Sequence, residues 1–503
     1  MRERILDFLS DRGTLAEPEV IEYLLRQEDP IASAAKVIGL FQEPPMVITL
    51  ENVLRTSGIG RAVTTRVPLE VATVVVAPPT PPEMHVRIEA AMPASFRRSG
   101  IPAPEIAEDL RILKDITGRS TCEGTLADFS RYFHHRFTTL SRILRSRPEG
   151  AGAIEIARAK RLSREVKMIG IVRDVRPTKN GHRIVELEDD TDTVSVLLLA
   201  NSSLAADPIV HDEVIGVVGT SNERGLMIAK SILHPDLPTA KSFPRTRDRI
   251  RVAFMSDIHV GSRTFLADRW AKFRDWVTNG DELARSLRYL VVIGDVVDGI
   301  GVYPRQDEEL VIDDIYAQYE ALAGMCAEMP DHLKVVLLPG NHDAVRPAEP
   351  QPALPPPIQK LFDSNVVFGG NPCTLSIHGV RILGYHGRSM DDFVSALPAM
   401  TYARPLEAMR EMLRKRHLAP IYGGKTPIAP EAEDHLIIDQ VPDVFVTGHV
   451  HAAAIGEHRG VVLVNSSTWQ AQTSYQKMHN IEPMPARLPI LDLHTGEAFQ
   501  KSF

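Results

Sequence analysis

The chain has 503 residues, enough for roughly two to four domains, and 44% of them are hydrophobic. Its net charge of -8 excludes a chain that is basic throughout, although a local basic surface is still compatible with it. Three widely spaced cysteines without CxxC spacing argue against zinc fingers and a disulfide scaffold. The apolar runs are too short to cross a bilayer. We therefore expect a cytoplasmic protein with no membrane partner.

The first 105 residues are expected to form a helical module and a linker. In residues 1–60, apolar residues recur on one helical face before Gly13 and again after Pro18. A plain packing domain is the simpler interpretation of this module. Prolines crowd the stretch from Pro78 to Pro82, which predicts an extended, semi-rigid linker over residues 61–105.

Residues 106–164 are expected to be a basic helical segment. Its apolar positions recur at helical spacing: Phe129, Phe133, Phe137, Leu140 and Leu144. Its basic residues are Arg131, Arg136, Arg142, Arg145, Arg147, Arg158, Lys160, Arg161 and Arg164. Basic residues interleaved with aromatic ones can bind nucleic acid, but a charged helix can equally be a packing element with a solvated face. Both interpretations stay open.

Between residues 165 and 240 the hydrophobic period changes to two. Five short runs have the character of strands, and Asn180-Gly181 is a hairpin signal. The runs are KMIGIVRDVRP, GHRIVELEDD, DTVSVLLLAN, DEVIGVVGTSN and GLMIAKSIL. Five strands in about seventy residues are typical of an oligonucleotide-binding (OB) barrel, with another small barrel as the alternative.

From residue 250 to residue 503, strands alternate with helices, as in layered α/β folds. Five of the apolar strands end in carboxylate, amide or imidazole side chains. The endings are Asp257 and His259; Asp295 and Asp298; Asn341, His342 and Asp343; His386; and His449 and His451. Because ligands of α/β sheets bind beyond the carboxyl ends of the strands, we expect these groups to meet.

The residue types at these endings suit a metal centre. Imidazole and carboxylate without thiolate favour manganese, iron, zinc or nickel, and a pair of ions can stabilise both the attacking and the leaving oxygen of a phosphoryl transfer. Gly294, Gly340 and Gly448 are expected to let the backbone approach the site. Any one ending could be a simple turn, but all five in this order predict a metal site.

The motifs Asp257-x-His259, GDVVD, GNHD, His386 and GHVH resemble those of the calcineurin-like metallophosphoesterase superfamily. The resemblance implies a layered β-sandwich flanked by helices and two divalent ions, manganese foremost, with magnesium, iron, nickel or zinc as alternatives. One ion would be held by Asp257, His259, Asp295 and His451, and the other by Asp295, Asn341, His386 and His449, with Asp295 bridging. His342 would stabilise or protonate the leaving oxygen, and Asp343 would orient His342.

The superfamily includes protein phosphatases, but these carry Arg after GDxVD and Glu after GNH, where this chain has Gly299 and Asp343. The order of parts, with STCEGTLADFSRYFHHRF, PGNHDAVRPAEPQP and GYHGRSMDDF, instead resembles the small subunits of archaeal family-D DNA polymerases. This resemblance implies a 3′→5′ exonuclease for single-stranded or mispaired DNA ends. It also implies a large catalytic subunit as partner, in a heterodimer or a higher hetero-oligomer, with replication factors as further candidates. A catalytically silent accessory subunit and a free-standing DNA-repair nuclease are the alternatives.

Overall fold

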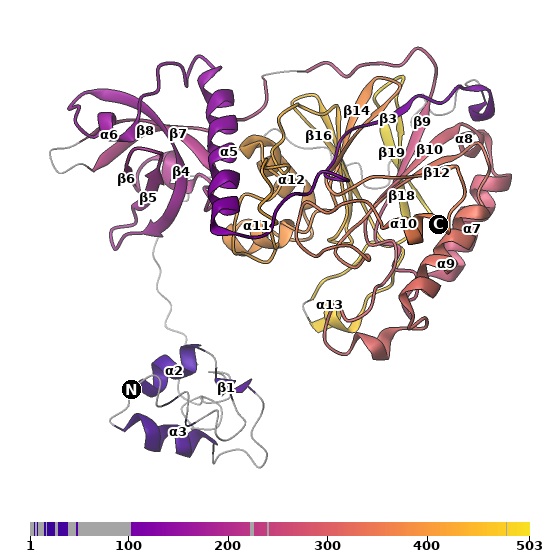
Figure 1. The fold of residues 1–503 in the computed structure, drawn as a ribbon, viewed down its shortest axis with the longest axis horizontal. Coiled ribbons are helices and arrows are strands. Elements are labelled where there is room, and N and C mark those ends of the chain that lie inside the picture. The colour runs from indigo at the N-terminus through magenta and orange to yellow at the C-terminus, as the bar shows by residue number, and fades with distance from the viewer. Residues whose placement is uncertain are drawn as a thin grey trace, which may run out of the picture. The chain divides into compact units, whose positions relative to one another are not determined.

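Figure 1 shows the protein as a computed structural model. The structure describes residues 102–503 except 222–225, 239–240 and 479; of the first 101 residues it describes 5, 8, 15–16, 18–25, 29–38 and 47–48. The chain divides into two units, Met1–Pro81 and Pro82–Phe503. The linker expected over residues 61–105 lies outside the described residues, apart from 102–105. None of the helices in the described ranges combines the length and the apolar character needed to cross a bilayer.

In the first unit, the described helices are α2 (Pro18–Leu25) and α3 (Pro30–Ile38). Val20, Ile21 and Leu24 are buried, which agrees with the apolar face expected for the second helix of the module. Two short strands, β1 (Leu15–Ala16) and β2 (Val47–Ile48), pair in parallel. The sequence did not indicate these strands, because two residues are too few to show a period of two.

The second unit contains a closed barrel with strand order β4-β5-β6-β8-β7, in which β7 pairs back onto β4. Its strands coincide with the five predicted runs: β4 (Glu165–Pro177), β5 (Arg183–Glu188), β6 (Thr193–Leu198), β7 (Val214–Ser221) and β8 (Met227–Leu233). Val172, Leu187, Val196 and Val217 fill its interior. The assignment of this barrel to the OB class stays a prediction.

Two six-stranded sheets form the C-terminal domain, with orders β12-β11-β10-β9-β18-β19 and β16-β17-β15-β14-β13-β3. The strands of the first are β9 (Arg251–Met255), β10 (Leu287–Ile293), β11 (Lys334–Leu338), β12 (Val366–Phe368), β18 (Arg487–Asp492) and β19 (Ala498–Ser502). The strands of the second are β3 (Leu110–Lys114), β13 (Cys373–Ile377), β14 (Val380–Gly384), β15 (Val444–Thr447), β16 (Ala453–His458) and β17 (Val461–Ser466). The sheets face each other across one apolar core, in which Phe254 and Val291 of the first sheet lie among Ile382 and Val446 of the second.

Helices cover the outer faces of both sheets (Figure 1). Trp270 and Tyr319 pack from α7 and α9 onto the first sheet, and Phe393 and Met409 pack from α11 and α12 onto the second. Because both faces of each sheet are covered, the central strands are almost continuously apolar. The helices are α7 (Ala267–Asn279), α8 (Glu282–Arg285), α9 (Ile315–Ala327), α10 (Pro356–Gln359), α11 (Met390–Ala396), α12 (Pro405–Lys415) and α13 (Ser474–Met478).

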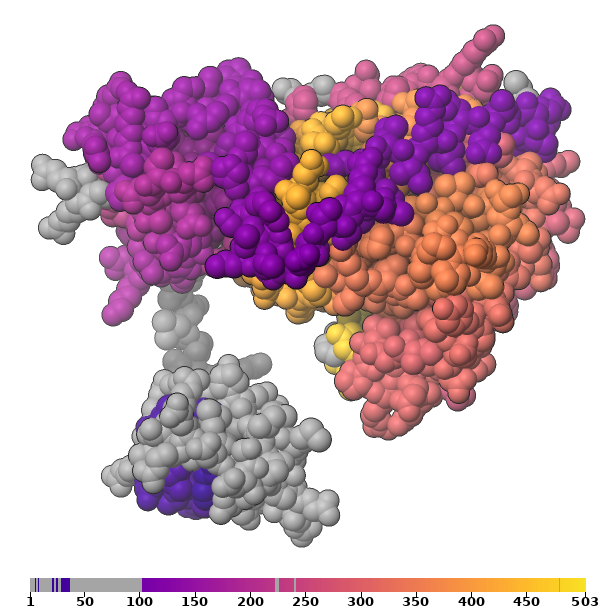
Figure 2. Space-filling view, viewed as in Figure 1, coloured from indigo at the N-terminus to yellow at the C-terminus, as the bar shows by residue number. Residues whose placement is uncertain are grey.

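The segment predicted as helical over residues 106–164 is more varied than expected. It contains the edge strand β3 as well as α5 (Leu126–Arg145) and α6 (Ile156–Ala159). β3 pairs with β13, far away in sequence, and so belongs to the C-terminal domain. Figure 2 shows residues 102–125, in indigo and violet, lying across the surface of that domain.

Some of the basic side chains of α5 make contacts within the protein, although Arg131, Arg142 and Arg145 are exposed. Arg136 is fully buried and donates to Asp434, and Arg131 pairs with Asp128 in the capping box at the start of the helix. At the other end of α5, Arg145 donates to the carbonyl of Ala153, and Arg147 just beyond the helix donates to that of Pro235. For Arg136 the contacts support the packing element, whereas the exposed arginines are compatible with either of the two interpretations left open above.

Candidate metal centre

The five strand endings meet at one edge of the two facing sheets. β9, β10 and β11 run parallel to one another, as do β14 and β15, so the carboxyl ends of each set lie on the same side. Asp257 follows β9, Asp295 follows β10, Asn341 follows β11, His386 follows β14, and His449 follows β15. The topology therefore brings together residues up to nearly two hundred positions apart in the sequence.

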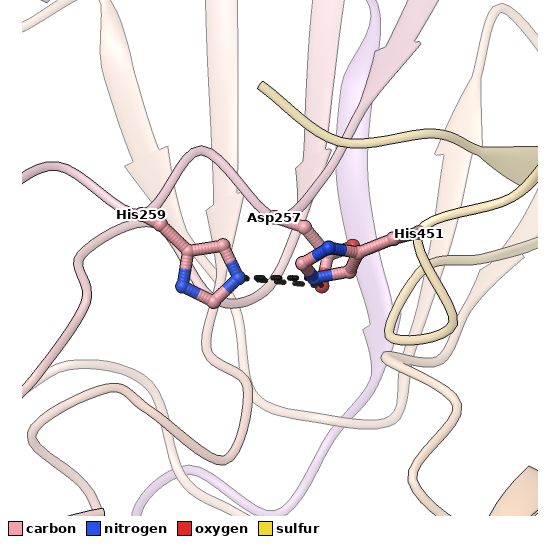
Figure 3. A group of neighbouring side chains, drawn as sticks. All are labelled: Asp257, His259 and His451. Carbon is pink, nitrogen blue, oxygen red and sulfur yellow. Dashed lines mark hydrogen bonds and ion pairs between the residues drawn. The ribbon is translucent and has the colours of Figure 1, made fainter. Parts of the chain in front are cut away.

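Asp257, His259 and His451 form the first group of side chains (Figure 3). Their ligand atoms all lie within 4.8 Å of one another. The Nε2 atoms of the two histidines are 3.2 Å apart, and Oδ1 of Asp257 is 3.4 Å from Nε2 of His451. All three residues are buried, so the atoms that could bind an ion converge within the protein.

Asp295, His386 and His449 form the second group. Oδ2 of Asp295 lies 3.2 Å from Nε2 of His386, and that same nitrogen lies 3.1 Å from Oδ1 of Asn341. These are the residues expected to hold the second ion. The grouping within 4.8 Å places Asp295 with the second set, so a bridging role for Asp295 stays a prediction.

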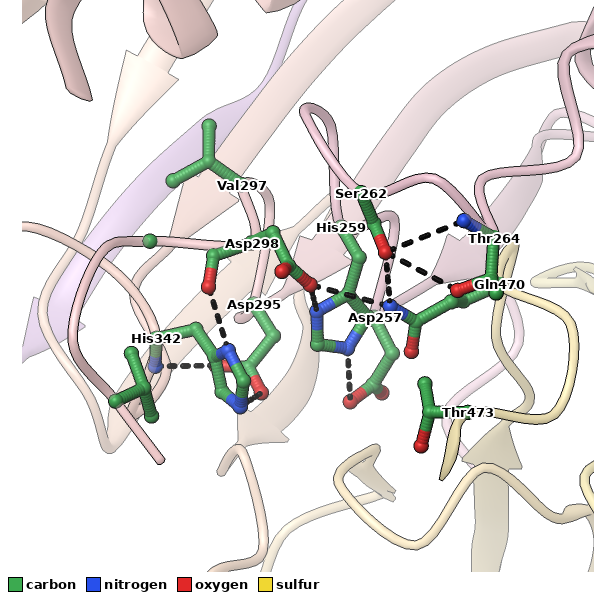
Figure 4. A network of polar contacts seen from close by, with 12 residues as sticks. Asp257, His259, Ser262, Thr264, Asp295, Val297, Asp298, His342, Gln470 and Thr473 are labelled. Atoms are coloured by element: carbon green, nitrogen blue, oxygen red, sulfur yellow. Dashed lines mark hydrogen bonds and ion pairs between the residues drawn. The ribbon is translucent and has the colours of Figure 1, made fainter. Parts of the chain in front are cut away.

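A further carboxylate, Asp298, supports the first group (Figure 4). Its Oδ1 atom lies 3.0 Å from Nδ1 of His259, which leaves Nε2 of His259 directed at Asp257 and His451. Gln470 and Gln306 donate to the two oxygens of Asp298. Although Asp298, His259 and His342 could themselves hold an ion, these donors already occupy Asp298, and we interpret it as the group that orients His259.

Each of the other site histidines likewise has a partner for one of its ring nitrogens. Nε2 of His449 lies 3.2 Å from Oδ2 of Asp391, and Nδ1 of His451 lies 2.8 Å from Nε2 of Gln476. Nδ1 of His386 donates to the carbonyl of Ile293. Sequence reasoning did not assign Asp391 or Gln476 to the site. A signal for Asp391 was available, because it follows His386 closely in GYHGRSMDDF.

The backbone is strained at most of the proposed ligand positions. Asp257, His259, Asp295, His449 and His451 all have positive φ angles, between 49° and 68°. This left-handed conformation is uncommon for residues other than glycine, and such residues cluster at functional sites. The strain indicates that the surrounding fold imposes the positions of these side chains.

The predicted glycines lie where a side chain would collide with the site. A Cβ atom on Gly340 would meet Oδ1 of Asp295, and one on Gly448 would meet Oδ2 of Asp257. A Cβ atom on Gly294 would meet Nδ1 of His386. These glycines permit the close approach of backbone to ligand side chains that the sequence predicted.

The donor set fits a divalent ion. Oδ1 of Asp257 is buried and accepts no hydrogen bond from the described residues. Burial alone would raise the pKa of Asp295, but the imidazoles of His386 and His342 outweigh it and hold that pKa well below its usual range. Burial lowers the pKa of His386, whereas the charge of Asp295 overrides this and raises the pKa to about 10. A divalent ion would compete with protons for these atoms, so its binding is expected to release protons.

His342 and Asp343 differ from expectation in their contacts. Nδ1 of His342 donates to the carbonyl of Asp298 at 2.7 Å, so this carbonyl, and not Asp343, orients the imidazole ring. The carboxylate of Asp343 instead accepts from the backbone of Gly340 and the hydroxyl of Tyr319. Burial and the charge of Asp295 raise the pKa of Asp343 to about 6. Asp343 therefore fixes the loop that carries His342.

A cavity of about 340 Å³ opens onto the two groups. Its inner wall includes His259, Asp295, Asn341, His342, His449 and His451. Arg388 and Lys425 add positive charge to its lining, and Tyr303 and Tyr475 add aromatic rings. Candidate metal ligands, cationic side chains and aromatic rings thus line one cavity, which suits a phosphate ester with an aromatic substituent.

Comparison with known proteins places the chain beside replication proteins. Residues 252–455 match the DNA polymerase alpha/epsilon B-subunit family. A DNA polymerase II small subunit from Halobacterium salinarum is 39% identical over 98% of this chain and 97% of its own length. The small subunit from Methanothermobacter thermautotrophicus is 45% identical over 80% of this chain and 85% of its own, and that from Archaeoglobus fulgidus is 44% identical over 76% and 78%.

Proposed function

The chain belongs to the archaeal DNA polymerase II small subunits, and on that premise we propose that it is a metal-dependent 3′→5′ exonuclease acting on single-stranded or mispaired DNA ends. Membership makes it an accessory subunit of a replicative polymerase and implies a separate large catalytic subunit as its partner. The exonuclease activity, the ions and the placement in the metallophosphoesterase superfamily are parts of the proposal.

One observation carries the proposal. The histidines and carboxylates of five strand endings converge, buried and with strained backbones, on one cavity. An accessory subunit that only held a complex together would gain nothing from this arrangement, because buried carboxylates and left-handed residues cost stability. When bound here, divalent ions would polarise the phosphoryl oxygens and activate water.

Asp257, His259 and His451 would hold one ion, and Asp295, Asn341, His386 and His449 the other. Manganese is the first expectation, with magnesium, iron, nickel and zinc as alternatives, because the set offers nitrogen and oxygen and no sulfur. The described cysteines support this choice, since none of Cys122, Cys326 and Cys373 lines the cavity.

Hydrolysis adds water to phosphorus and breaks the bond to the 3′ oxygen of the penultimate nucleotide, so the terminal nucleotide leaves as a 5′-monophosphate. The 3′ oxygen must take up a proton. Nε2 of His342 faces the cavity, 3.9 Å from Oδ2 of Asp295, while Nδ1 stays bonded to the carbonyl of Asp298. A protonated His342 can therefore deliver its Nε2 proton to the leaving oxygen without turning its ring.

The test is digestion of a mispaired 3′ end in manganese, by the chain alone and by its complex with the large subunit. We expect wild-type digestion, and a loss of roughly a hundredfold or more for His342→Ala with manganese content retained. If neither wild type nor His342→Ala digests, the chain is an accessory subunit without this activity. If both digest equally, the activity is present but His342 is not the proton donor. If His342→Ala instead loses manganese, His342 is a ligand and the assigned role is wrong.

A further inference from the structure

Aromatic side chains gather at the mouth of the cavity. Tyr303 and Tyr475 approach it from different parts of the chain, with ring centroids 6.5 Å apart and an angle of 37° between their planes. Tyr475 is 49% exposed, and Tyr303 is half-buried. The phenol of Tyr303 donates to Glu309, so its position is fixed by a residue outside the cavity lining.

This aromatic pair lies on a defined side of the metal centre. The ring of Tyr303 is 6.3 Å from the imidazole ring of His342, centroid to centroid. His342 is the proposed proton donor to the leaving 3′ oxygen, so Tyr303 lies beside the nucleotide that carries that oxygen. This nucleotide is the penultimate one, not the one that is released.

We propose that Tyr303 and Tyr475 form a stacking platform for the penultimate base of the DNA strand. The inference rests on the proposed function and extends it, because it assigns a base site to a cavity otherwise described by its phosphate chemistry. Stacking on aromatic rings is tolerant of sequence, since every base has a π-face. A platform without hydrogen-bond readout therefore suits an enzyme that must remove any nucleotide.

The charges in the cavity complement the platform. Arg388 and Lys425 also line the cavity, and Lys425 is exposed. Cations in such a position hold the phosphates of a strand without reading its sequence. A base on the platform must also leave its partner strand, which a frayed or mispaired end does at lower cost than a paired one. The platform thus gives a physical reason for the expected preference for mispaired ends.

The test measures binding, so that it does not depend on activity of the metal-loaded enzyme. Fluorescence anisotropy of the full chain in EDTA is compared for three labelled single strands: intact, abasic at the penultimate position and abasic at the terminal position. Wild type is expected to bind the penultimate-abasic strand about tenfold more weakly than the intact one, the usual scale for loss of one stacked base. The terminal-abasic strand should bind within about twofold of the intact one.

The variants complete a thermodynamic cycle. Tyr303→Leu should bind the intact strand about tenfold more weakly and no longer distinguish the penultimate-abasic strand. Tyr303→Phe keeps the ring and loses the hydrogen bond to Glu309, so it should bind DNA as tightly as wild type. If the hydroxyl group had a purely structural role, Tyr303→Phe would bind DNA more weakly than wild type. Tyr316→Leu is the matched control, because Tyr316 is 52% exposed and does not line the cavity.

Retained discrimination in Tyr303→Leu would overturn the platform, and so would a loss confined to the terminal-abasic strand. Digestion of the intact strand by wild type in manganese is measured in parallel. Failure of that digestion counts against the proposed function, whereas digestion without base discrimination counts against the platform alone.

Discussion

Two networks of buried histidine and aspartate lie in the second unit of this chain. They differ in whether both oxygens of the central aspartate accept hydrogen bonds. Around Asp434, His417 and Arg136 each donate to Oδ2 at 2.7 Å, and the backbone of Leu436 donates to Oδ1. Around Asp257, Oδ1 accepts no hydrogen bond from the described residues, although the Nε2 atoms of His259 and His451 face it.

The difference shows that residue type alone does not identify a metal site. Burial would raise the pKa of Asp434, but His417 and Arg136 outweigh it and hold that pKa far below its usual range. Asp434 therefore has a cation, Arg136, inside the protein and is expected to stabilise the fold. The atoms around Asp257 border an open cavity and keep their lone pairs directed at one another, which is the arrangement that a bound cation would relieve.

The strongest test of this comparison removes one carboxylate charge from the candidate metal centre, at Asp295, and one from the other network, at Asp434. Asp295→Asn keeps the size of the side chain and an acceptor for the backbone of His342, but removes the charge. We expect digestion of a mispaired 3′ end to fall at least about a thousandfold, because the charge on the ligands supplies several kcal/mol. The melting temperature should stay within a few degrees of wild type. Near wild-type digestion would disprove the ligand role.

Asp434→Asn is the partner experiment, with the opposite expected result. Removing this charge leaves Arg136 buried and unpaired, so the free energy of unfolding should fall by about 3–5 kcal/mol, as measured by chemical denaturation. Digestion per folded molecule and bound manganese should not change. A loss of manganese in this variant would show that the two networks are not separate.

A finer test uses two neighbouring aspartates of α11. Asp391 lies against His449, whereas Asp392 accepts from the backbone of Lys425 and Thr426. Asp391→Asn should weaken manganese binding by about 10- to 100-fold, the usual cost of losing a partner behind a ligand. Titration of bound manganese checks this. Asp392→Asn is the control and should leave manganese binding unchanged; equal losses would mean that Asp391 has no special role.

The smallest expected effect concerns Glu431, which ties residues 120–122 to Arg346. Burial would raise the pKa of Glu431, but hydrogen bonds from Ser120 and Thr121 outweigh it and lower the pKa to about 2. Because the folded pKa lies below the unfolded value of about 4.3, this carboxylate stabilises the fold above that value and loses the effect as pH falls toward 2. Glu431→Gln should cost about 1–3 kcal/mol at pH 7. Denaturation curves of the variant and wild type should converge near pH 2; a constant difference would contradict the assignment.

Much of this architecture could be predicted because its signals are local. The barrel strands each show a period of two, and the site residues each follow an apolar strand. The edge strand β3 could not be predicted in this way, since Leu110–Lys114 forms a strand only by pairing with Cys373–Ile377, some 260 residues later. The partner of Arg136 is likewise 298 residues away, so the sequence could not distinguish packing from DNA binding.

Within the site, the identity of the strand-end residues was more predictable than their roles. Asp298 and Asp343 are both carboxylates next to expected ligands. Only the direction of the rings shows that Asp298 supports His259 and that Asp343 fixes a loop. Asp391 and Gln476 were missed because they lie on helices rather than at strand ends. Side-chain direction depends on backbone geometry that periodicity does not encode.

The residues with positive φ angles around the candidate metal centre also affect how the sequences of this family can evolve. Each of Asp257, His259, Asp295, His449 and His451 holds a conformation that glycine adopts without strain. Replacing one of them by glycine therefore removes a ligand and relieves the backbone at the same step. If selection for hydrolysis were relaxed in a lineage, the mutations that abolish the site would meet little thermodynamic resistance. The proposed metal centre would then disappear before the fold that carries it.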